Sequence, residues 1–481
     1  MPEDALVNTD ATSERSRLIG RVREIQTKLH EWAVADSGHR FCDLYNLVTD
    51  QAFLAAAWTR VRGNRGARTA GVDARTVYYI EQEYGVPRFL AEIRQDLKSG
   101  MFAPSPVRER MIPKASGKLR RLGIPTVRDR VVQAALKLVL EPIFEADFRP
   151  CSYGFRPRRR AQDAIAEIHY LGTRGYHSVL EADIEACFDN IDHTALMDRV
   201  RRRIGDKKIL ALMKAFLKSG VMTELGRLEL NDTGTPQGGI ISPLLANVAL
   251  SVLDEHFEQR WNALGGQAGR AKARRRGVPV FRLVRYADDF VILVRGTEEQ
   301  TEDLRAEVAS ILAPMGLRLS AAKTSVVHME VGFDFLGFHI RRDRKRGTRD
   351  KWAVYTYPSK KALASIVGKV RAATRKNTAA SMANLLRKLN PMIRGWCTYF
   401  KYGASKNTFA YLAAFSWRRV WRWTVKLHPK TPIRTLRRRY FPEWKPTDGE
   451  VRLYYADETA VSRYRYRGTL IPNPWTERAA A

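Results

Sequence analysis

The chain has 481 residues and carries 83 Lys and Arg against 51 Asp and Glu, a formal net charge of +32. This much positive charge favours a polyanionic partner, with nucleic acid ahead of a membrane surface. With 44% apolar residues and 10 Trp, the chain is not a disordered basic tail, and its length allows roughly two or three folded domains.

Cysteine usage and hydropathy point to the cytoplasm. The 4 cysteines show neither a Cys-x-x-Cys pair nor a Cys/His pairing at zinc spacing, so neither a disulfide framework nor zinc is expected. Residues 1–30 lack the apolar core of a signal peptide. The most apolar long stretch, Ile240 to Leu253, is too short to span a bilayer and contains Pro243. We therefore expect a cytoplasmic protein without a membrane partner.

Residues 1–60 are expected to form an N-terminal extension with an amphipathic helix. From Glu14 onward, apolar residues recur at helical spacing among basic ones. The following segment, 61–73, has three glycines and three arginines and predicts a loop. Two interpretations of its arginines stay open: a solvated surface loop, or guanidinium groups of Arg62, Arg65 and Arg68 that face phosphates.

The stretch from Arg110 to Pro125 predicts a hairpin that turns at Ser116-Gly117. Lys114 and Arg120 put cations on its two arms, as a hairpin closing over a triphosphate would need. The alternative is a charged edge hairpin, because cations on edge strands discourage aggregation.

A second strand is expected from Ser178, with Asp183 near its end. A carboxylate at the end of an apolar strand is well placed to join others in a cleft. Asp192 or Asn190 is expected to cap a helix that starts near His193, so Asp189 and Asp192 are interpreted as turn and cap residues.

Residues 235–247 combine Pro-Gln-Gly-Gly with the start of an apolar helix. Gly238 and Gly239 permit close backbone approach. Ser242 followed by Pro243 predicts an N-cap and first helical residue. The Gly-, Ala- and Arg-rich segment 265–277 that follows the helix is expected to be a basic loop.

Residues 281–295 predict a tight hairpin, since two runs of β-branched and aromatic residues flank Ala287-Asp288-Asp289. Adjacent carboxylates repel each other unless a cation lies between them. Hard ions such as Mg²⁺ take oxygen ligands, usually one or two carboxylates with substrate phosphates. A solvated Asp-Asp turn is the alternative for an isolated pair. Asp183 is expected to join this pair.

From Lys351 through Pro442 there is no Asp or Glu, although Lys and Arg are plentiful. Such a surface binds phosphate by charge neutralisation, and its affinity should fall steeply with salt. Trp417 and Trp421 lie four residues apart and are expected to pack in a core, while base stacking by one of the other aromatic residues of this region stays open. Residues 441–481 are expected to form a basic tail, and a short DNA-contacting element is one hypothesis for it.

Four features in their chain order resemble a template-directed polymerase. They are the basic hairpin, the strand-end Asp183, the Gln-Gly-Gly turn and the Asp-Asp hairpin. More specifically, the chain resembles the reverse transcriptases, or maturases, encoded by bacterial group II introns. The resemblance implies an α+β right-hand fold, with fingers and palm (61–345) built on antiparallel sheet and an α-helical thumb or maturase domain (346–440). Its most specific stretches are Ile112–Pro125, Thr235–Asn247, Tyr286–Asp289 and Arg394–Phe400.

The resemblance also implies roles for individual residues. The catalytic triad would be Asp183, Asp288 and Asp289, with two Mg²⁺ ions held by these carboxylates and the backbone carbonyl of Ile184. Phe188 would exclude a 2′-hydroxyl, and Gln237-Gly238 would pack against the nascent base pair. The dNTP would be bound by Lys114, Arg120, Phe188, Gln237, Gly238 and Lys323. Arg62, Arg65 and Arg68 would contact the template, and Arg394, Trp396, Arg418, Arg419 and Arg422 the intron RNA.

The implied function is an RNA-directed DNA polymerase that copies intron RNA into cDNA during retrohoming and promotes splicing. Its partners would be group II intron RNA and a DNA primer or target, in a bacterial cytoplasm with nucleoid or ribonucleoprotein. Many family members end in an HNH endonuclease, which this chain is expected to lack, so the primer would come from elsewhere. Two alternatives stay open: a reverse transcriptase detached from an intron, for phage defence or CRISPR adaptation, and a splicing factor without polymerase activity. The oligomeric state is open, a homodimer included.

Overall fold

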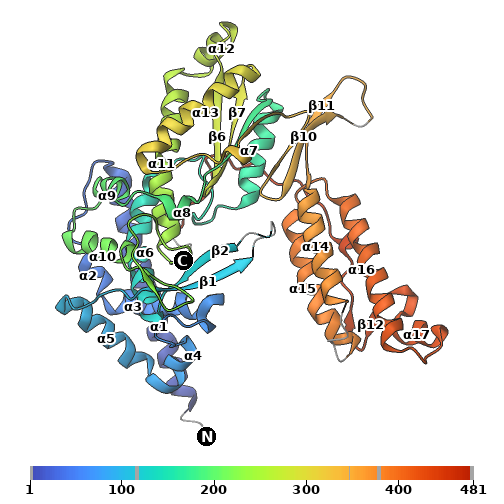
Figure 1. The fold of residues 1–481 in the computed structure, drawn as a ribbon, viewed down its shortest axis with the longest axis horizontal. Helices are drawn as coiled ribbons and strands as arrows, with labels where there is room; N and C mark the ends of the chain where they lie inside the picture. Colours follow the sequence, from blue (N-terminus) through green and yellow to red (C-terminus); the bar gives the residue numbers. More distant parts are fainter. Residues whose placement is uncertain (1–3, 114–116, 118, 346, 376–380, 477–481) are drawn as a thin grey trace.

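A computed structural model describes residues 4–113, 117, 119–345, 347–375 and 381–476. N-terminal helices with the β1–β2 hairpin, a four-stranded sheet with its covering helices, and the group α14–α17 occupy different parts of the molecule (Figure 1). We refer to these three parts as fingers, palm and thumb. Antiparallel sheets followed by a helical region confirm the expected α+β fold.

The fingers are organised around α6 (Val127–Asp147), which is almost completely buried under α1 (Asp4–Ala35) and α3 (Gln51–Gly63). Pro142 lies inside α6, and because it has no N–H group it leaves the Leu138 carbonyl without its helical partner. The Gln26 amide of α1 donates to that carbonyl over 2.6 Å. Packing of α1 on α6 therefore satisfies the polar group that the proline exposes. The remaining fingers helices are α2 (Tyr45–Val48), α4 (Val77–Tyr79) and α5 (Val86–Ser99).

The basic hairpin is confirmed as β1 (Val107–Pro113) and β2 (Leu119–Ile124), paired antiparallel. Its turn residues 114–116, and with them Lys114, lie outside the described residues. A four-stranded sheet forms when β1 pairs in parallel with β4 (Val221–Met222) and β4 with β5 (Leu228–Glu229).

The palm sheet has the order β6-β7-β3-β8, and all of its pairs are antiparallel. Successive side chains of β7 alternate between two cores: Phe290, Ile292 and Val294 share one with α11 and α13, while Val291 and Leu293 share the other with α7. Helices on both faces explain why the central strand β7 is apolar from Phe290 to Val294. The elements are β3 (Ser178–Asp183), β6 (Val280–Tyr286), β7 (Asp289–Arg295), β8 (Ser325–His328), α7 (Ala161–Thr173), α8 (Cys187–Asn190), α9 (His193–Arg201), α10 (Lys207–Leu217), α11 (Ser242–Ala263), α12 (Gln267–Arg275) and α13 (Glu298–Leu312).

A three-stranded sheet, ordered β11-β10-β9, leads from the palm into the thumb. The thumb helices share a core that includes Val370, Leu385, Leu389 and Leu412. Ser359 and Ser381 cap the first two of these helices through their hydroxyl groups. The elements are β9 (Phe333–Phe335), β10 (Phe338–Arg344), β11 (Trp352–Pro358), α14 (Lys360–Ala373), α15 (Met382–Phe400), α16 (Lys406–Leu427) and α17 (Ile433–Tyr440).

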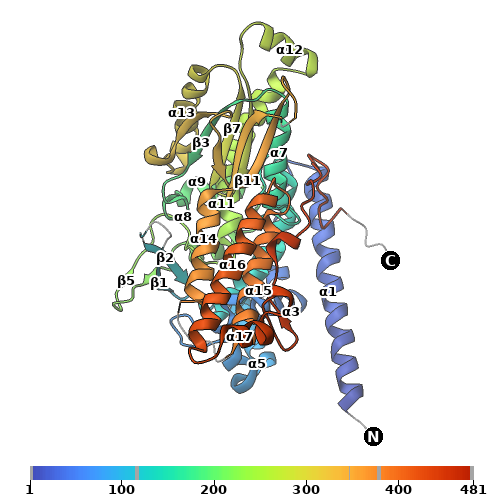
Figure 2. The same cartoon turned by 90° about the vertical axis from the view of Figure 1, so that its right-hand side faces the viewer.

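The described part of the C-terminal segment, 441–476, is packed rather than free. After a short hairpin of β12 (Thr447–Asp448) and β13 (Val451–Arg452), it returns past the palm to α1 (Figure 2). Arg467 forms an ion pair of 2.7 Å with the buried Asp163 of α7, and Trp475 packs beside His30. These contacts pack the basic tail expected from the sequence against α7 and α1.

Three local predictions are wrong. The expected loop 265–277 contains α12, since its Ala, Arg and Lys residues are good helix formers between the flanking glycines. The expected loop 61–73 begins as the last turn of α3 and continues as a 3-10 helix, Arg65–Arg68. Ser242 starts α11 without capping it, because its hydroxyl donates to the Pro236 carbonyl. In the described residues, no helix is both long and apolar enough for a membrane span.

Candidate active site

Three carboxylates, two from adjacent strands and one from a hairpin turn, meet at one end of the palm sheet. β3 and β7 pair Asp183 with Asp289, the last residue of one strand with the first of the other. The β6–β7 hairpin closes Tyr286 against Asp289 through Ala287 and Asp288, with Ala287 at φ 59°. Two-residue hairpin turns of this type need such left-handed backbone. The predicted hairpin and the proximity of Asp183 are therefore confirmed, while the catalytic role of the three residues stays a prediction.

Two of the three carboxylates, those of Asp288 and Asp289, have raised pKa values. Burial is the largest cause that raises the pKa of Asp289 to about 6, and the charges of Asp288 and Asp183 add to the rise. Burial also raises the pKa of Asp288, and the charge of Asp183 acts in the same direction. A group of acids that resists ionisation in this way would be relieved by a bound cation.

A lysine partly neutralises this cluster. The ammonium group of Lys323, at the end of the 3-10 helix Ala321–Lys323, lies 2.6 Å from a carboxylate oxygen of Asp183. Its side chain is 66% exposed, against 21% for Asp183. Lys323 is therefore held at the carboxylates but faces solvent, where it is also free to meet an anion.

The oxygen atoms at this end of the sheet suit a hard divalent ion. Besides the carboxylates, the Ile184 carbonyl is available. In the bridge between Ile184 and Leu319, the Ser320 amide donates to the Asp183 carbonyl, and the Glu185 amide donates to the Arg318 carbonyl. The Ile184 carbonyl takes no part in these two bonds and therefore points away from the bridge. Within the described residues, no three His, Cys, Asp or Glu side chains are already spaced to hold an ion. Mg²⁺ commonly uses one or two carboxylates with water and substrate phosphates, so these donors fit an ion that binds together with a nucleotide.

A fully buried arginine supports the turn from behind. Arg285 of β6 donates to both carboxylate oxygens of Asp254 on α11, over 2.8 and 2.5 Å. It also donates to the Asn247 side chain over 2.9 Å and to the Ala287 carbonyl over 3.0 Å. This network was missed by sequence reasoning, although an arginine in the middle of an apolar strand was the available signal.

The backbone approaches the turn closely on the same side. A Cβ atom at Gly154 would lie 2.3 Å from the Ala287 nitrogen. The Asn247 amide donates to the Gly154 carbonyl over 2.9 Å, which fixes this segment beside the turn. Any side chain at position 154 would therefore displace the residue that precedes the two aspartates.

The Gln-Gly-Gly turn joins the fingers hairpin to the palm. The Gly123 amide of β2 donates to the Gln237 carbonyl over 2.8 Å. Gly238 has φ 120°, and a Cβ atom there would lie 2.5 Å from the Gly123 oxygen. On the same hairpin, the charge of Arg120 partly opposes the rise in the pKa of Asp288, so this guanidinium acts electrostatically on the carboxylates. Of the predicted nucleotide ligands, only Lys114 lies outside the described residues.

Phe188 follows the end of β3 closely. It belongs to the short helix α8, is half-buried, and packs edge-on against Phe155 with ring centroids 6.3 Å apart. Its carbonyl accepts from the Thr235 amide over 2.6 Å. The structure therefore brings Phe188 beside both Asp183 and the Pro-Gln-Gly-Gly segment, and its role as a sugar gate stays a prediction.

The arginines expected to face a template lie on the fingers surface. Arg62 forms an ion pair of 2.5 Å with Glu81, whereas Arg65 and Arg68 are exposed. A buried guanidinium, that of Arg130, donates to the carbonyls of Gly66, Thr69 and Pro125. It thereby fastens this segment to the chain between β2 and α6.

The thumb residues expected to bind RNA fall into two groups. Arg394, Arg418 and Arg422 are exposed. Arg419 is held by the Thr374 hydroxyl over 2.8 Å, and Trp396 packs half-buried against Phe400.

The packing interpretation of the other tryptophans is confirmed. The Trp417 and Trp421 rings stack with centroids 5.8 Å apart, and both contact Phe441.

Comparisons with known proteins match both halves of this architecture. A family model described as reverse transcriptase (RNA-dependent DNA polymerase) matches residues 112–340, and one described as the maturase-specific domain of group II introns matches residues 363–441. Neither is an HNH endonuclease. The group II intron-encoded protein LtrA of Lactococcus lactis is 30% identical in an alignment of 450 residues that covers 78% of this chain and 74% of that protein. Protein YkfC of Escherichia coli is 37% identical over 390 residues, covering 76% of this chain and 97% of that protein.

Proposed function

This chain belongs to the group II intron-encoded reverse transcriptases, RNA-directed DNA polymerases with a maturase-specific domain, and we propose that it copies the RNA of its own intron into cDNA during retrohoming and promotes splicing of that RNA. The family implies a divalent metal ion and binding of intron RNA. The observation that carries the polymerase assignment is the convergence of Asp183, Asp288 and Asp289 at one end of the palm sheet.

In the proposed reaction, the 3′-hydroxyl of a DNA primer attacks the α-phosphate of a dNTP and pyrophosphate leaves. Two Mg²⁺ ions, when bound, would lower the pKa of the attacking hydroxyl and stabilise the leaving group. Asp183, Asp288 and the Ile184 carbonyl are the proposed ligands, and Asp289 completes the acidic cluster. The raised pKa values of Asp288 and Asp289 support this assignment, since the cluster gains most from a cation.

The proposed nucleotide site lies between the fingers hairpin and the palm. Arg120, Lys323 and Lys114 would neutralise the triphosphate. The ion pair between Lys323 and Asp183 supports this role, because the lysine can pass from the carboxylate to the phosphates as a metal ion replaces it. Phe188 would lie under the sugar, and Gln237-Gly238 would contact the nascent base pair.

RNA binding is proposed for two basic surfaces. Arg62, Arg65 and Arg68 would contact the template at the fingers. The thumb would grip intron RNA through exposed cations such as Arg394, Arg418 and Arg422, with Arg419 beside them and Trp396 as a packing residue that keeps α15 in place. The absence of acidic residues from 351 to 442 supports this, since the thumb cations have no carboxylate of their own segment to pair with.

The assignment is tested by extending a DNA primer on an RNA template with dNTPs and Mg²⁺. Extension should be lost in Asp288→Ala and unchanged in the matched control Asp303→Ala, whose carboxylate is exposed on α13. Splicing of the intron RNA by Asp288→Ala should persist, because the thumb is intact. Full primer extension by Asp288→Ala would remove the polymerase assignment from these carboxylates.

A reverse transcriptase that works apart from an intron is the second candidate. Protein YkfC aligns over 97% of its length, and its name refers to no intron. The two candidates differ in the DNA that flanks the gene, which should encode folded ribozyme domains only for the first. The first also requires that the flanking transcript binds far more tightly than an unrelated structured RNA.

A further inference from the structure

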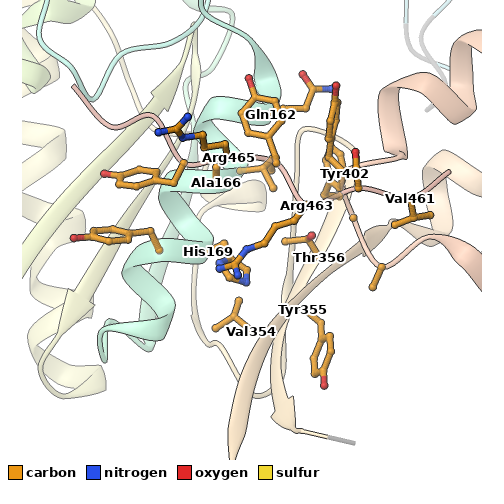
Figure 3. Close-up of a pocket in the computed structure, with 18 of the residues that line it drawn as sticks. Gln162, Ala166, His169, Val354, Tyr355, Thr356, Tyr402, Val461, Arg463 and Arg465 are labelled. Atoms are coloured by element: carbon orange, nitrogen blue, oxygen red, sulfur yellow. The ribbon is translucent and has the colours of Figure 1, made fainter. Parts of the chain in front are cut away.

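A cavity of about 650 Å³ lies where the palm, the β10–β11 ribbon and the C-terminal segment meet (Figure 3). Its walls come from four stretches of chain: α7, strands β10 and β11, the turn after α15 and residues 461–466. None of the residues assigned to the polymerase site lines it. Its volume lies within the roughly 300–1,000 Å³ typical of small-molecule sites.

Aromatic and aliphatic side chains dominate the lining, which also contains two arginines, Arg463 and Arg465. Six aromatic side chains contribute to it, and among its described lining residues there is no Asp or Glu. The Tyr466 ring stacks on Tyr170 with centroids 4.3 Å apart, so part of the wall is preformed. The aromatic residues are Tyr170, Phe338, Tyr355, Tyr402, Tyr464 and Tyr466.

An arginine without a carboxylate partner points into this space. In Figure 3 the Arg463 guanidinium lies beside the His169 ring, whereas that of Arg465 points away from it. Among the described ion pairs, Arg463 takes part in none. Burial is the largest cause that lowers the pKa of His169, and the charge of Arg463 lowers it further. A hydrogen bond to the Val354 backbone acts in the opposite direction. The lowered pKa favours the neutral imidazole, which serves as a polar group beside the Arg463 guanidinium.

We propose that this cavity binds a nucleoside phosphate, with the base among the tyrosine rings and the phosphate on Arg463. A flat aromatic ring stacks on tyrosine regardless of base identity, at about 1–3 kcal/mol per base. Guanidinium groups bind phosphate through charge-assisted hydrogen bonds, and the lining offers no carboxylate to compete. Gln162, Thr356 and His169 add polar contacts for the edge of a base or the sugar.

The occupant has two possible sources with the same chemistry: a free nucleotide, or one unpaired nucleotide of a strand. Because α7 belongs to the palm while residues 461–466 belong to the C-terminal segment, either occupant would tie the two together. This proposal is independent of the intron assignment and of the carboxylate site.

The first experiment titrates the full chain with AMP by calorimetry in EDTA, which suppresses metal-dependent nucleotide binding at the carboxylates. Arg463→Ala should weaken AMP binding at least tenfold, by about the worth of one charged hydrogen bond. Arg344→Ala, a matched loss of charge at an exposed position of β10 outside the cavity lining, should change it less than about threefold. Ala166→Phe should abolish it by filling the cavity from α7 without a change in charge. Adenosine and ribose 5-phosphate, which each lack one half of the ligand, should bind at least about tenfold more weakly than AMP.

The second experiment separates the two sources. A single-stranded oligoadenylate that displaces AMP from the wild type would identify a nucleotide of a strand, while failure to displace it would identify a free nucleotide. Thermal unfolding and primer extension of each variant show that the fold and the polymerase site are intact. No AMP binding at about 1 mM, or equal binding by wild type, Arg463→Ala and Ala166→Phe, would overturn the proposal.

Discussion

Arg285 has two separable functions. Its ion pair with Asp254 is fully buried, so each partner neutralises the buried charge of the other. Its third donor group holds the Ala287 carbonyl, in the turn that presents Asp288 and Asp289. Replacing a buried ion pair by apolar residues of similar size is often neutral for stability, whereas removing one partner costs about 3–5 kcal/mol.

We expect Arg285→Met with Asp254→Leu to fold with nearly the wild-type free energy of unfolding, and Arg285→Met alone to be strongly destabilised. The double variant should nevertheless lose at least about tenfold in kcat for primer extension, because the Ala287 carbonyl is no longer held. Urea unfolding and single-turnover extension measure the two effects. A double variant with wild-type kcat would reduce the network to a structural role.

Asp289 predicts a pH dependence of the metal-free protein. Its pKa is raised from 3.8 to about 6, so between these values the folded state binds more protons than the unfolded state. The contribution of this group to stability is therefore present below pH 4 and is lost as pH rises to about 6. Asp289→Asn should be more stable than the wild type above pH 6 in EDTA, and equal to it near pH 4. Asp289 keeps an exposed surface, so we expect a gain below about 1 kcal/mol by urea unfolding. A gain that is independent of pH would contradict the assignment.

At the scale of elements, local pattern predicted most of the site. The β6–β7 hairpin and β3 follow from apolar strand runs, and the side chains of β7 alternate between the core with α11 and α13 and the core with α7. The sequence did not reveal partners chosen by tertiary packing. Arg467 pairs with Asp163 across 304 positions, and Arg285 reaches Asp254 on another element. The helix α12 was missed for a different reason, since glycines at its ends outweighed good helix formers between them.

Gly238 should couple the fingers hairpin to catalysis. In Gly238→Ala the new Cβ atom would push against the Gly123 oxygen, 2.5 Å away, and shift β2 with Arg120. We expect a rise of about tenfold in the KM for dNTP with a smaller change in kcat, because binding is affected more than chemistry. Gly226→Ala is the control, since Gly226 also has positive φ but no atom within 4 Å of the added Cβ. Steady-state primer extension at varied dNTP concentration measures KM and kcat for both variants. Equal KM values for the two variants would exclude the coupling.

For the whole molecule, charge is distributed so that the thumb has cations but, between residues 351 and 442, no acidic residue. Elsewhere many cations are paired, as Lys28 is with Glu24 on α1 at 2.8 Å. Arg418 and Arg422, by contrast, are exposed on α16. Exposed cations such as these two arginines, rather than cations held in ion pairs, neutralise phosphates and release counterions when RNA binds.

The dependence of RNA affinity on salt should therefore change with the thumb alone. Each phosphate contact contributes about 0.7 to 0.9 to the slope of log K against log salt. Arg418→Ala with Arg422→Ala should lower the slope by about 1 to 2, and Lys28→Ala should leave it unchanged. Filter binding of the flanking intron transcript between about 50 and 200 mM KCl measures this. If the double variant keeps the wild-type slope, RNA does not lie on this face of α16, and the thumb cations must serve the overall field of the protein rather than direct contact.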